Sequence, residues 1–351
     1  MTTGVGRSRA FGYPSTGTVE VLQEAERAVS APGLGQVQIR LSRSGVNPTD
    51  VKSRRGALHM PIPDGEVQVP HHDGAGTIVA VGEGVDVFQP GHRVWTHLAA
   101  YRRLDGTAQE VITLDSSRVA PLPDHASFEL GASLGVPFLT AHRLLTLRET
   151  GPRELHAGAL ADVAVLVAGG AGAVGNAAIQ LAIWAGATVV TTVSSAAKAA
   201  LARAAGAHHV INYRDEDVSA RVRALLPDGV DVVVEVSPAV NLPIDLEVLR
   251  TGGALAVYAN DSGADLTLSV QRLMWLNLQV AFVILYSLPE EQLASAVRAV
   301  SAALDARAIG VGPDHGLPVL SFALDDIAAA HAAVESGPIG KIQLHIHPVE
   351  R

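Results

Sequence analysis

The chain of 351 residues contains no cysteine. This absence excludes disulfide bonds, thiolate catalysis and zinc sites built from cysteine ligands. It fits a reducing compartment, and we expect a cytoplasmic location. The N-terminal residues also lack the apolar core of a secretory signal peptide, so no such signal is expected.

Charged residues and long apolar runs are both scarce. Only 17% of the residues are charged, the net charge is −9, and no basic tract occurs, which argues against a nucleic-acid binder. The longest apolar stretch, residues 273–288, is shorter than the ~20 residues of a membrane span, and Asn277 and Gln279 interrupt it. We therefore predict a buried strand there and no membrane association. With 48% apolar residues, the chain is expected to be globular.

A glycine turn between an apolar run and a helical segment is the most informative feature present. The run Val163–Ala168 leads into Gly170-x-Gly172-x-x-Gly175, and a second β-type run, Ala187–Val193, follows the helical segment. This is the spacing and context of a dinucleotide-binding fingerprint, in which the helix N-terminus binds the pyrophosphate. The backbone positions expected to contact the cofactor are Gly170, Gly172, Ala173, Val174 and Gly175.

The end of the second run indicates which nicotinamide cofactor is used. An acidic residue about 20 residues beyond the glycines binds the ribose hydroxyls of NAD, but Ser194 stands at that position here. Hydroxyl groups and an ammonium can bind a 2′-phosphate, whereas a carboxylate would repel it. We therefore predict NADP(H), with contacts from Ser194, Ser195, Lys198 and Tyr213.

The order of the predicted elements indicates an α/β protein of two domains. Short strands and turns fill the first third, and alternating helices and strands follow from about residue 127, as in a doubly wound parallel sheet. We expect a β-rich substrate domain over residues 1–136 and 287–351, and a nucleotide-binding domain over 137–286. The substrate is expected to meet the nicotinamide in the cleft between them.

Motifs along nearly the whole chain resemble the medium-chain dehydrogenase/reductase superfamily, and most closely its zinc-independent, zeta-crystallin-like quinone oxidoreductases. Besides the glycine turn, the motifs are Gly45-Val-Asn-Pro-Thr-Asp50, His72-Asp-Gly-Ala-Gly76, Gly84-Val-x-x-Phe-x-x-Gly-His-Arg-Val94, Gly106-Thr-Ala-Gln-Glu110, Gly135-Val-Pro-Phe-Leu-Thr-Ala-His142, Gly206-Ala-His-His-Val-Ile-Asn-Tyr213 and Gly340-Lys341. The resemblance implies a GroES-like catalytic domain, a Rossmann domain, and reduction of quinones or α,β-unsaturated carbonyl compounds by NADPH. It also implies a homodimer built through the edge strand at Gln279–Leu285.

The zinc-dependent alcohol dehydrogenases in the same superfamily hold their metal with a cysteine, a histidine and usually a second cysteine. By the resemblance, Asn47 and Val136 stand at the two cysteine positions, while His72 aligns with the zinc histidine and Asp73 follows it. One imidazole and one carboxylate are a poor set against the three protein ligands of a catalytic zinc. We expect no zinc.

The resemblance also places candidate catalytic residues. Asn47 aligns with a substrate-side asparagine, and Thr140 with a threonine close to the nicotinamide. Lys52 stands where these reductases often carry a tyrosine, and could stabilise an oxyanion or be a flexible residue at the rim; His59 lies near a second such position. The loss of both tyrosines indicates a changed substrate.

Two other functions stay open from the sequence. One is a zinc-independent, NADP-dependent alcohol or carbonyl dehydrogenase. The other is a cofactor-binding regulatory or structural protein with little turnover. The acidic net charge argues against RNA binding as part of such a function.

Overall fold

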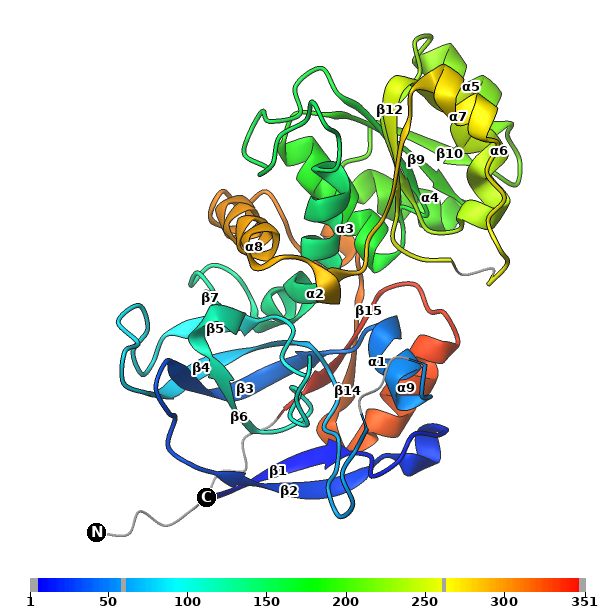
Figure 1. The fold of residues 1–351 in the computed structure, drawn as a ribbon. Helices are drawn as coiled ribbons and strands as arrows, with labels where there is room; N and C mark the ends of the chain where they lie inside the picture. Colours follow the sequence, from blue (N-terminus) through cyan, green and yellow to red (C-terminus); the bar gives the residue numbers. More distant parts are fainter. Residues whose placement is uncertain (1–5, 58–60, 261–262, 347–351) are drawn as a thin grey trace. The chain divides into compact units, whose positions relative to one another are not determined.

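The computed structural model describes residues 6–57, 61–260 and 263–346 (Figure 1), which divide into two compact units. Unit 1 takes in the described residues up to Val136 and those from Val319 onward. Unit 2 takes in those of Pro137–Pro318. Helix α2 (Phe128–Leu145) begins in unit 1 and ends in unit 2.

Unit 2 is built on a six-stranded sheet with the order β10-β9-β8-β11-β12-β13, in which every neighbouring pair is parallel. Both β8 and β11 are buried along their whole length, because helices cover both faces and the strands can be apolar on both sides. The strands are β8 (Ala164–Ala168), β9 (Thr188–Val193), β10 (His209–Asn212), β11 (Val230–Glu235), β12 (Leu249–Val257) and β13 (Gln279–Phe282).

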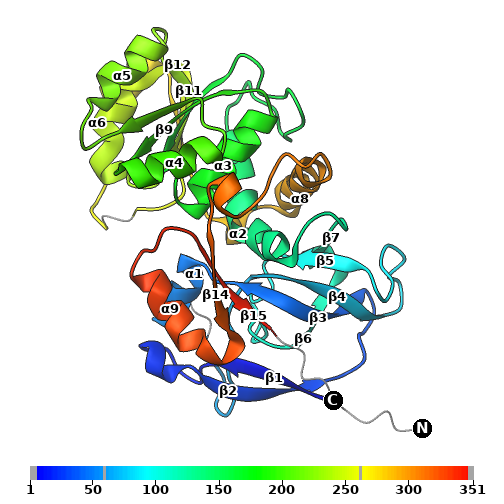
Figure 2. The same cartoon turned by 180° about the vertical axis from the view of Figure 1, so that it is seen from behind.

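Helices α3 and α4 lie on one face of this sheet and α5 and α6 on the other (Figures 1 and 2). The chain runs outward from β8 in one direction through β9 and β10, then returns to β11 and runs outward in the other. The strand order therefore reverses at the carboxyl ends of β8 and β11, where open α/β sheets bind ligands. The helices are α3 (Ala173–Trp184), α4 (Ala196–Ala204), α5 (Val218–Leu225), α6 (Pro238–Val248), α7 (Val270–Leu276) and α8 (Glu290–Asp305).

Unit 1 contains a two-stranded and a seven-stranded sheet. The larger sheet has the order β14-β15-β3-β4-β5-β7, with β6 also paired to β3, and is antiparallel except between β14 and β15. Helices α1 (Pro48–Arg54) and α9 (Ile327–Glu335) pack against each other. The strands are β1 (Gly6–Gly12), β2 (Gln23–Val29), β3 (Gln36–Gly45), β4 (Asp73–Val81), β5 (Arg93–Thr96), β6 (Val111–Asp115), β7 (Val119–Pro121), β14 (Val319–Ala323) and β15 (Lys341–His345).

Residues 287–318 group with unit 2, whereas the boundary expected from the sequence placed them in the first domain. Their contacts give the physical reason. Helix α8 packs against α3, and the amide of Gln180 donates to the Gly310 carbonyl (3.1 Å) and accepts from the Gly310 N–H (2.8 Å). Asn176 donates to the His315 carbonyl (2.8 Å), so two polar side chains of α3 bind this segment.

The prediction of a buried strand over residues 273–288 is wrong for most of that stretch. Its first residues complete α7, only Gln279–Phe282 form a strand, and a short 3-10 helix covers Leu285–Ser287. Strand β13 is the last strand of its sheet among the described residues, and Phe282 at its end is 65% exposed. Trp275, at 78% exposed, lies on α7 before it. In the described part of the chain, no helix combines the length and apolar composition needed to cross a membrane.

Candidate active site

The glycine turn joins β8 to α3, and each of its three glycines meets a different environment. A Cβ atom at Gly170 would collide with the Thr191 side chain, and one at Gly175 with the Gly169 backbone. At Gly172, which caps α3, the nearest atom to such a Cβ would be the Gly169 carbonyl oxygen at 3.4 Å. The chain's own packing therefore requires glycine at the first and third positions and leaves space at the second.

The residues expected to contact the adenosine end of the cofactor come together at the carboxyl edge of the sheet. Ser194 directly follows β9, and Tyr213 directly follows β10, whose last residue is paired with Val193. The Tyr213 N–H donates to the Val193 carbonyl (3.1 Å), and the Tyr213 side chain is 52% exposed. This part of unit 2 presents hydroxyl groups beside the N-terminus of α4.

The hydroxyl of Ser195 has a structural role at this edge. It caps α4 by accepting a hydrogen bond from the Lys198 N–H (3.3 Å). A capping hydroxyl still carries its own proton and can donate it to an anion. Lys198 lies in the first turn of the helix, and its side chain is partly exposed.

In unit 1, Asn47 is the N-cap residue of α1 and is buried. Its backbone N–H donates to Asp50 Oδ2 (2.7 Å). Its side-chain Nδ2 donates to Asp73 Oδ2 (2.8 Å), and its Oδ1 accepts from Lys341 Nζ (2.6 Å). The carboxamide is thus fixed at both ends by charged groups.

Asp73 begins β4 and receives hydrogen bonds at both of its carboxylate oxygens. Oδ1 accepts from the Val136 N–H (2.8 Å) inside α2, while Oδ2 accepts from Asn47 and lies 3.5 Å from Lys341 Nζ. The close approach depends on Gly135, because a Cβ atom there would collide with the Asp73 carboxylate. A glycine in α2 therefore lets the carboxylate reach a helix N–H.

Asp50 and His72 line a cavity of about 70 Å³ in unit 1. Burial, with a further contribution from the Asp73 charge, raises the pKa of Asp50 to about 8. Burial lowers the pKa of His72 to about 3, with Arg118 adding to the shift. His72 Nε2 lies 3.9 Å from Asp50 Oδ1. Near neutral pH the cavity therefore holds a protonated carboxyl and a neutral imidazole.

The other two predicted catalytic residues lie outside this hydrogen-bonded group. Lys52 is exposed on α1, between buried Val51 and partly exposed Ser53. Thr140 is buried in the interior of α2, within unit 2. His59 lies outside the described residues.

Sequence reasoning did not assign a role to Lys341, which was noticed only as part of a terminal motif. The residue is 2% exposed and lies 294 residues from Asn47 along the chain. A lysine at the start of a strand that is otherwise buried and mostly uncharged, Lys341–His345, is the signal that could have identified it.

The described residues around Asn47 and Asp73 do not form a set of metal ligands. Within residues 6–57, 61–260 and 263–346, no three His, Cys, Asp or Glu side chains come together as a metal site would require. Asn47 and Asp73 instead bind the ammonium of Lys341. The residues at the position of a catalytic zinc therefore do not fit that metal.

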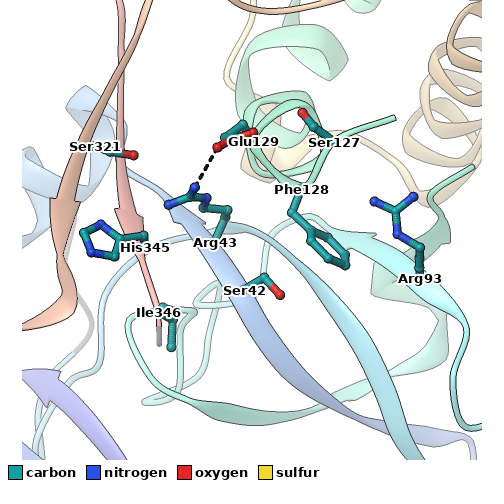
Figure 3. Close-up of a pocket in the computed structure, with 9 residues that line it drawn as sticks. All are labelled: Ser42, Arg43, Arg93, Ser127, Phe128, Glu129, Ser321, His345 and Ile346. Carbon is teal, nitrogen blue, oxygen red and sulfur yellow. Dashed lines mark hydrogen bonds and ion pairs between the residues drawn. The ribbon is translucent and has the colours of Figure 1, made fainter. Parts of the chain in front are cut away.

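A second pocket of unit 1, of about 640 Å³, contains none of the predicted site residues (Figure 3). Its two arginines already have partners: Arg43 pairs with Glu129 (2.6 Å), and Arg93 donates to the carbonyls of Pro123 and Ala126. Arg93 also stacks over the Phe128 ring, at 4.5 Å from its centroid.

Comparison with known proteins identifies both halves of the chain. Residues 33–124 match the family described as alcohol dehydrogenase GroES-like domain, and residues 173–302 match the one described as zinc-binding dehydrogenase. The quinone oxidoreductase of Lama guanicoe is 31% identical over 98% of this chain and 99% of its own.

Two solved structures extend this similarity to the whole fold. The Escherichia coli quinone oxidoreductase complexed with NADPH superposes with a TM-score of 0.75 at 28% identity, covering 96% of this chain and 99% of that one. A quinone oxidoreductase of Pseudomonas syringae gives a TM-score of 0.78 at 27% identity, with the same coverage. With its GroES-like unit and Rossmann unit, the chain belongs to the medium-chain dehydrogenase/reductase superfamily of oxidoreductases, where it is similar to the quinone oxidoreductases.

Proposed function

We propose that this protein is an NADPH-dependent, metal-free reductase that transfers hydride to a quinone or an α,β-unsaturated carbonyl compound. The observation that carries the proposal is the glycine turn with its space at Gly172, followed at β9 by Ser194 in place of a carboxylate. The names of the similar proteins, several of them quinone oxidoreductases, support the acceptor class.

The cofactor residues fit NADPH by their chemistry. The first-turn N–H groups of α3, at Ala173 and Val174, face no helical acceptor and carry the positive end of the helix dipole, which suits the pyrophosphate. The hydroxyl groups of Ser194 and Ser195, with the ammonium of Lys198, suit the 2′-phosphate. Tyr213, directly after β10, would cover the adenosine end. Bound NADPH supplies the hydride.

On the acceptor side, the protein must stabilise the negative charge that develops on oxygen as hydride reaches carbon. The Asn47 amide nitrogen has two hydrogens, of which Asp73 takes one. We infer that the second donates to the acceptor oxygen. Lys52 contributes positive charge from the exposed face of α1, and Thr140 contributes its hydroxyl near the nicotinamide.

The metal-free part of the proposal follows from the donor set. Zinc-catalysed carbonyl reduction uses the metal to polarise the oxygen. By the resemblance, Asn47 stands here in place of a zinc-binding cysteine, and its amide binds a buried ammonium. Metal analysis by inductively coupled plasma should find well under one zinc per chain, and a chelator should leave turnover unchanged. One zinc per chain, with activity lost on its removal, would reject this part.

The homodimer belongs to the proposal as well. Among the described strands, none pairs with the outer edge of β13. Apolar residues on this strand and close to it in the sequence are exposed, including Met274, Trp275, Phe282 and Ile284. An exposed apolar edge strand is a ready site for pairing with a second copy.

The decisive experiment follows NADPH consumption at the nicotinamide absorbance with quinones, enones, aldehydes and ketones, with NADH and a chelator in parallel. We expect chelator-resistant, NADPH-selective turnover of a quinone or an enone. Turnover of simple aldehydes or ketones alone would identify a carbonyl dehydrogenase instead. Tight NADPH binding without any turnover would indicate a binding protein.

A further inference from the structure

We propose that Lys341 is a positioning residue for the reaction: its buried ammonium fixes the Asn47 amide so that one N–H points at the acceptor oxygen. This inference rests on the proposed function, because it acts through the role assigned there to Asn47. Nothing in the motif that contains Lys341 assigns it a task. The geometry around its Nζ atom does.

Three oxygen atoms surround the Lys341 nitrogen inside unit 1. The Asn47 Oδ1 atom is 2.6 Å away, the Val46 carbonyl oxygen 3.2 Å, and Asp73 Oδ2 3.5 Å. The lysine side chain is 2% exposed and that of Asp73 is fully buried. Water therefore does not screen this group, and electrostatic interactions are stronger there than at the surface.

The protonation state follows from the partners. An ammonium has three N–H donors, and each of the three neighbours is an acceptor, whereas a neutral amine would turn its lone pair toward an oxygen. The Asp73 oxygens, in turn, face only donors. Burial lowers the pKa of Lys341 and raises that of Asp73, but each charge opposes the shift of the other. Lys341 and Asp73 therefore form a charged pair.

This pair decides which way the Asn47 carboxamide faces. A rotation of 180° would place the amide nitrogen against the ammonium and the amide oxygen against the Asp73 carboxylate. The first is a donor–donor contact and the second an acceptor–acceptor contact. Only the observed orientation satisfies both neighbours. It fixes the direction of both Nδ2 hydrogens, as a preorganised donor requires. The Asp50 carboxyl also hydrogen-bonds the Asn47 side chain, so the acceptor oxygen would share the second hydrogen with Asp50.

A double-mutant cycle tests the proposal in the full-length protein with NADPH and 1,4-naphthoquinone. Lys341→Met keeps the length of the side chain and removes its charge. We expect kcat to fall roughly 10- to 100-fold, since one oxyanion donor is worth about 10²–10³-fold in kcat. The dissociation constant for NADPH should stay within about twofold, because Lys341 and the cofactor residues belong to different units. Asn47→Ala should lower kcat to a similar or greater degree.

The combined variant distinguishes positioning from stability. If Lys341 acts through Asn47, Lys341→Met costs nothing further in the Asn47→Ala background. Independent effects that multiply would overturn the proposal, as would a Lys341→Met enzyme with wild-type kcat. Gln343→Leu is the matched control: Gln343 is equally buried on β15, but it bonds Glu129 and Ser133. It should lower the melting temperature and leave kcat unchanged.

Two further readouts complete the design. Lys341→Gln retains a donor for the Asn47 oxygen and should recover part of kcat. If Lys341→Met does not fold, the double-mutant cycle can be run with Lys341→Gln in its place. If Asn47→Ala alone keeps wild-type kcat, the role of Asn47 in the proposed function fails and the positioning role fails with it. If Asn47→Ala is impaired and Lys341→Met is not, only the positioning role is rejected.

Discussion

Two glycines of the same turn should respond differently to one added methyl group. At Gly172 an alanine fits the fold, so Gly172→Ala should keep the melting temperature and weaken NADPH binding at least about tenfold, by filling space meant for the pyrophosphate. At Gly170 the methyl group collides with Thr191, so Gly170→Ala should lower the free energy of unfolding by about 1–3 kcal/mol.

Thermal melts and NADPH titrations of the two variants provide the measurement. Unchanged NADPH affinity in Gly172→Ala, with its fold intact, would contradict cofactor binding at the turn.

Cofactor preference should depend on Ser194. In Ser194→Asp the new carboxylate repels a 2′-phosphate and can accept hydrogen bonds from the ribose hydroxyls of NADH. We expect kcat/KM for NADPH to fall at least about tenfold, since one repulsive contact of about 1.4 kcal/mol suffices, while kcat/KM for NADH rises or holds.

Ser194→Asn has the same shape without the charge and serves as the control; it should change the preference much less. Equal losses in the two variants would show that sterics, and not charge, act at this position.

The position of residues could be predicted from the sequence wherever a local pattern identifies them. The glycine turn and the hydroxyl groups after β9 were found from spacing alone, and the structure places them at one edge of the sheet; that they bind the cofactor stays a prediction. The partners of Asn47 could not be predicted in that way. Asp73 and Lys341 reach it from β4 and β15 through pairings with β3, and no local pattern contains strand pairing over such distances.

At the scale of elements, the exposed edge of β13 yields a prediction about assembly. Phe282 is 65% exposed on this strand, and Phe282→Asp would place a charge at the centre of the proposed dimer contact. We expect a dimer in the wild type and a monomer in the variant by light scattering after gel filtration, with the melting temperature changed by only a few degrees.

Leu34→Asp is a matched control, because Leu34 is 77% exposed in unit 1, far along the chain from β13. A wild-type monomer, or a Phe282→Asp dimer, would rule out this interface.

The segment that contains β13 also shows which elements a sequence pattern cannot predict. The apolar run over residues 273–288 predicted burial, but composition cannot tell a strand buried in its own chain from one at an open edge. Helices such as α4 and α5 are easier to recognise, since a capping Ser195 or Asp217 and an amphipathic period mark each one locally.

For the whole molecule, buried ionisable groups predict a stability maximum near neutral pH. Burial lowers the pKa of His97 and His142 to about 4 and that of His331 to about 3, from an ordinary value of 6.5. Between the lowered pKa values and 6.5, these histidines bind more protons in the unfolded chain than in the folded one. The free energy of unfolding should therefore decrease as the pH falls below about 6.5.

Above neutral pH the free energy of unfolding should also decrease, because of a carboxyl group whose pKa is raised in the folded chain. Asp50 keeps its proton up to a pKa of about 8 in the folded chain, so its contribution to stability is present at low pH and is lost as the pH rises through about 8. Melting temperatures between pH 4.5 and 9 should therefore pass through a maximum near pH 6–7. Asp50→Asn should flatten the alkaline side, and Asp86→Asn, at an exposed carboxyl, should not. A monotonic profile would contradict both assignments.

Because the sequence of unit 2 is inserted into that of unit 1, the two units are completed at different times during synthesis. Unit 2 is continuous, from Pro137 to Pro318, but β3 pairs with β15, which follows it. At roughly 5–20 residues per second, the ribosome needs on the order of tens of seconds to pass from one part of unit 1 to the other. By the end of that interval all of unit 2 has been synthesised, while the part of β3 that pairs with β15 is still open and Asn47 still lacks the ammonium of Lys341. The proposed nucleotide site can thus be complete before the proposed catalytic group, which needs β15 and its Lys341.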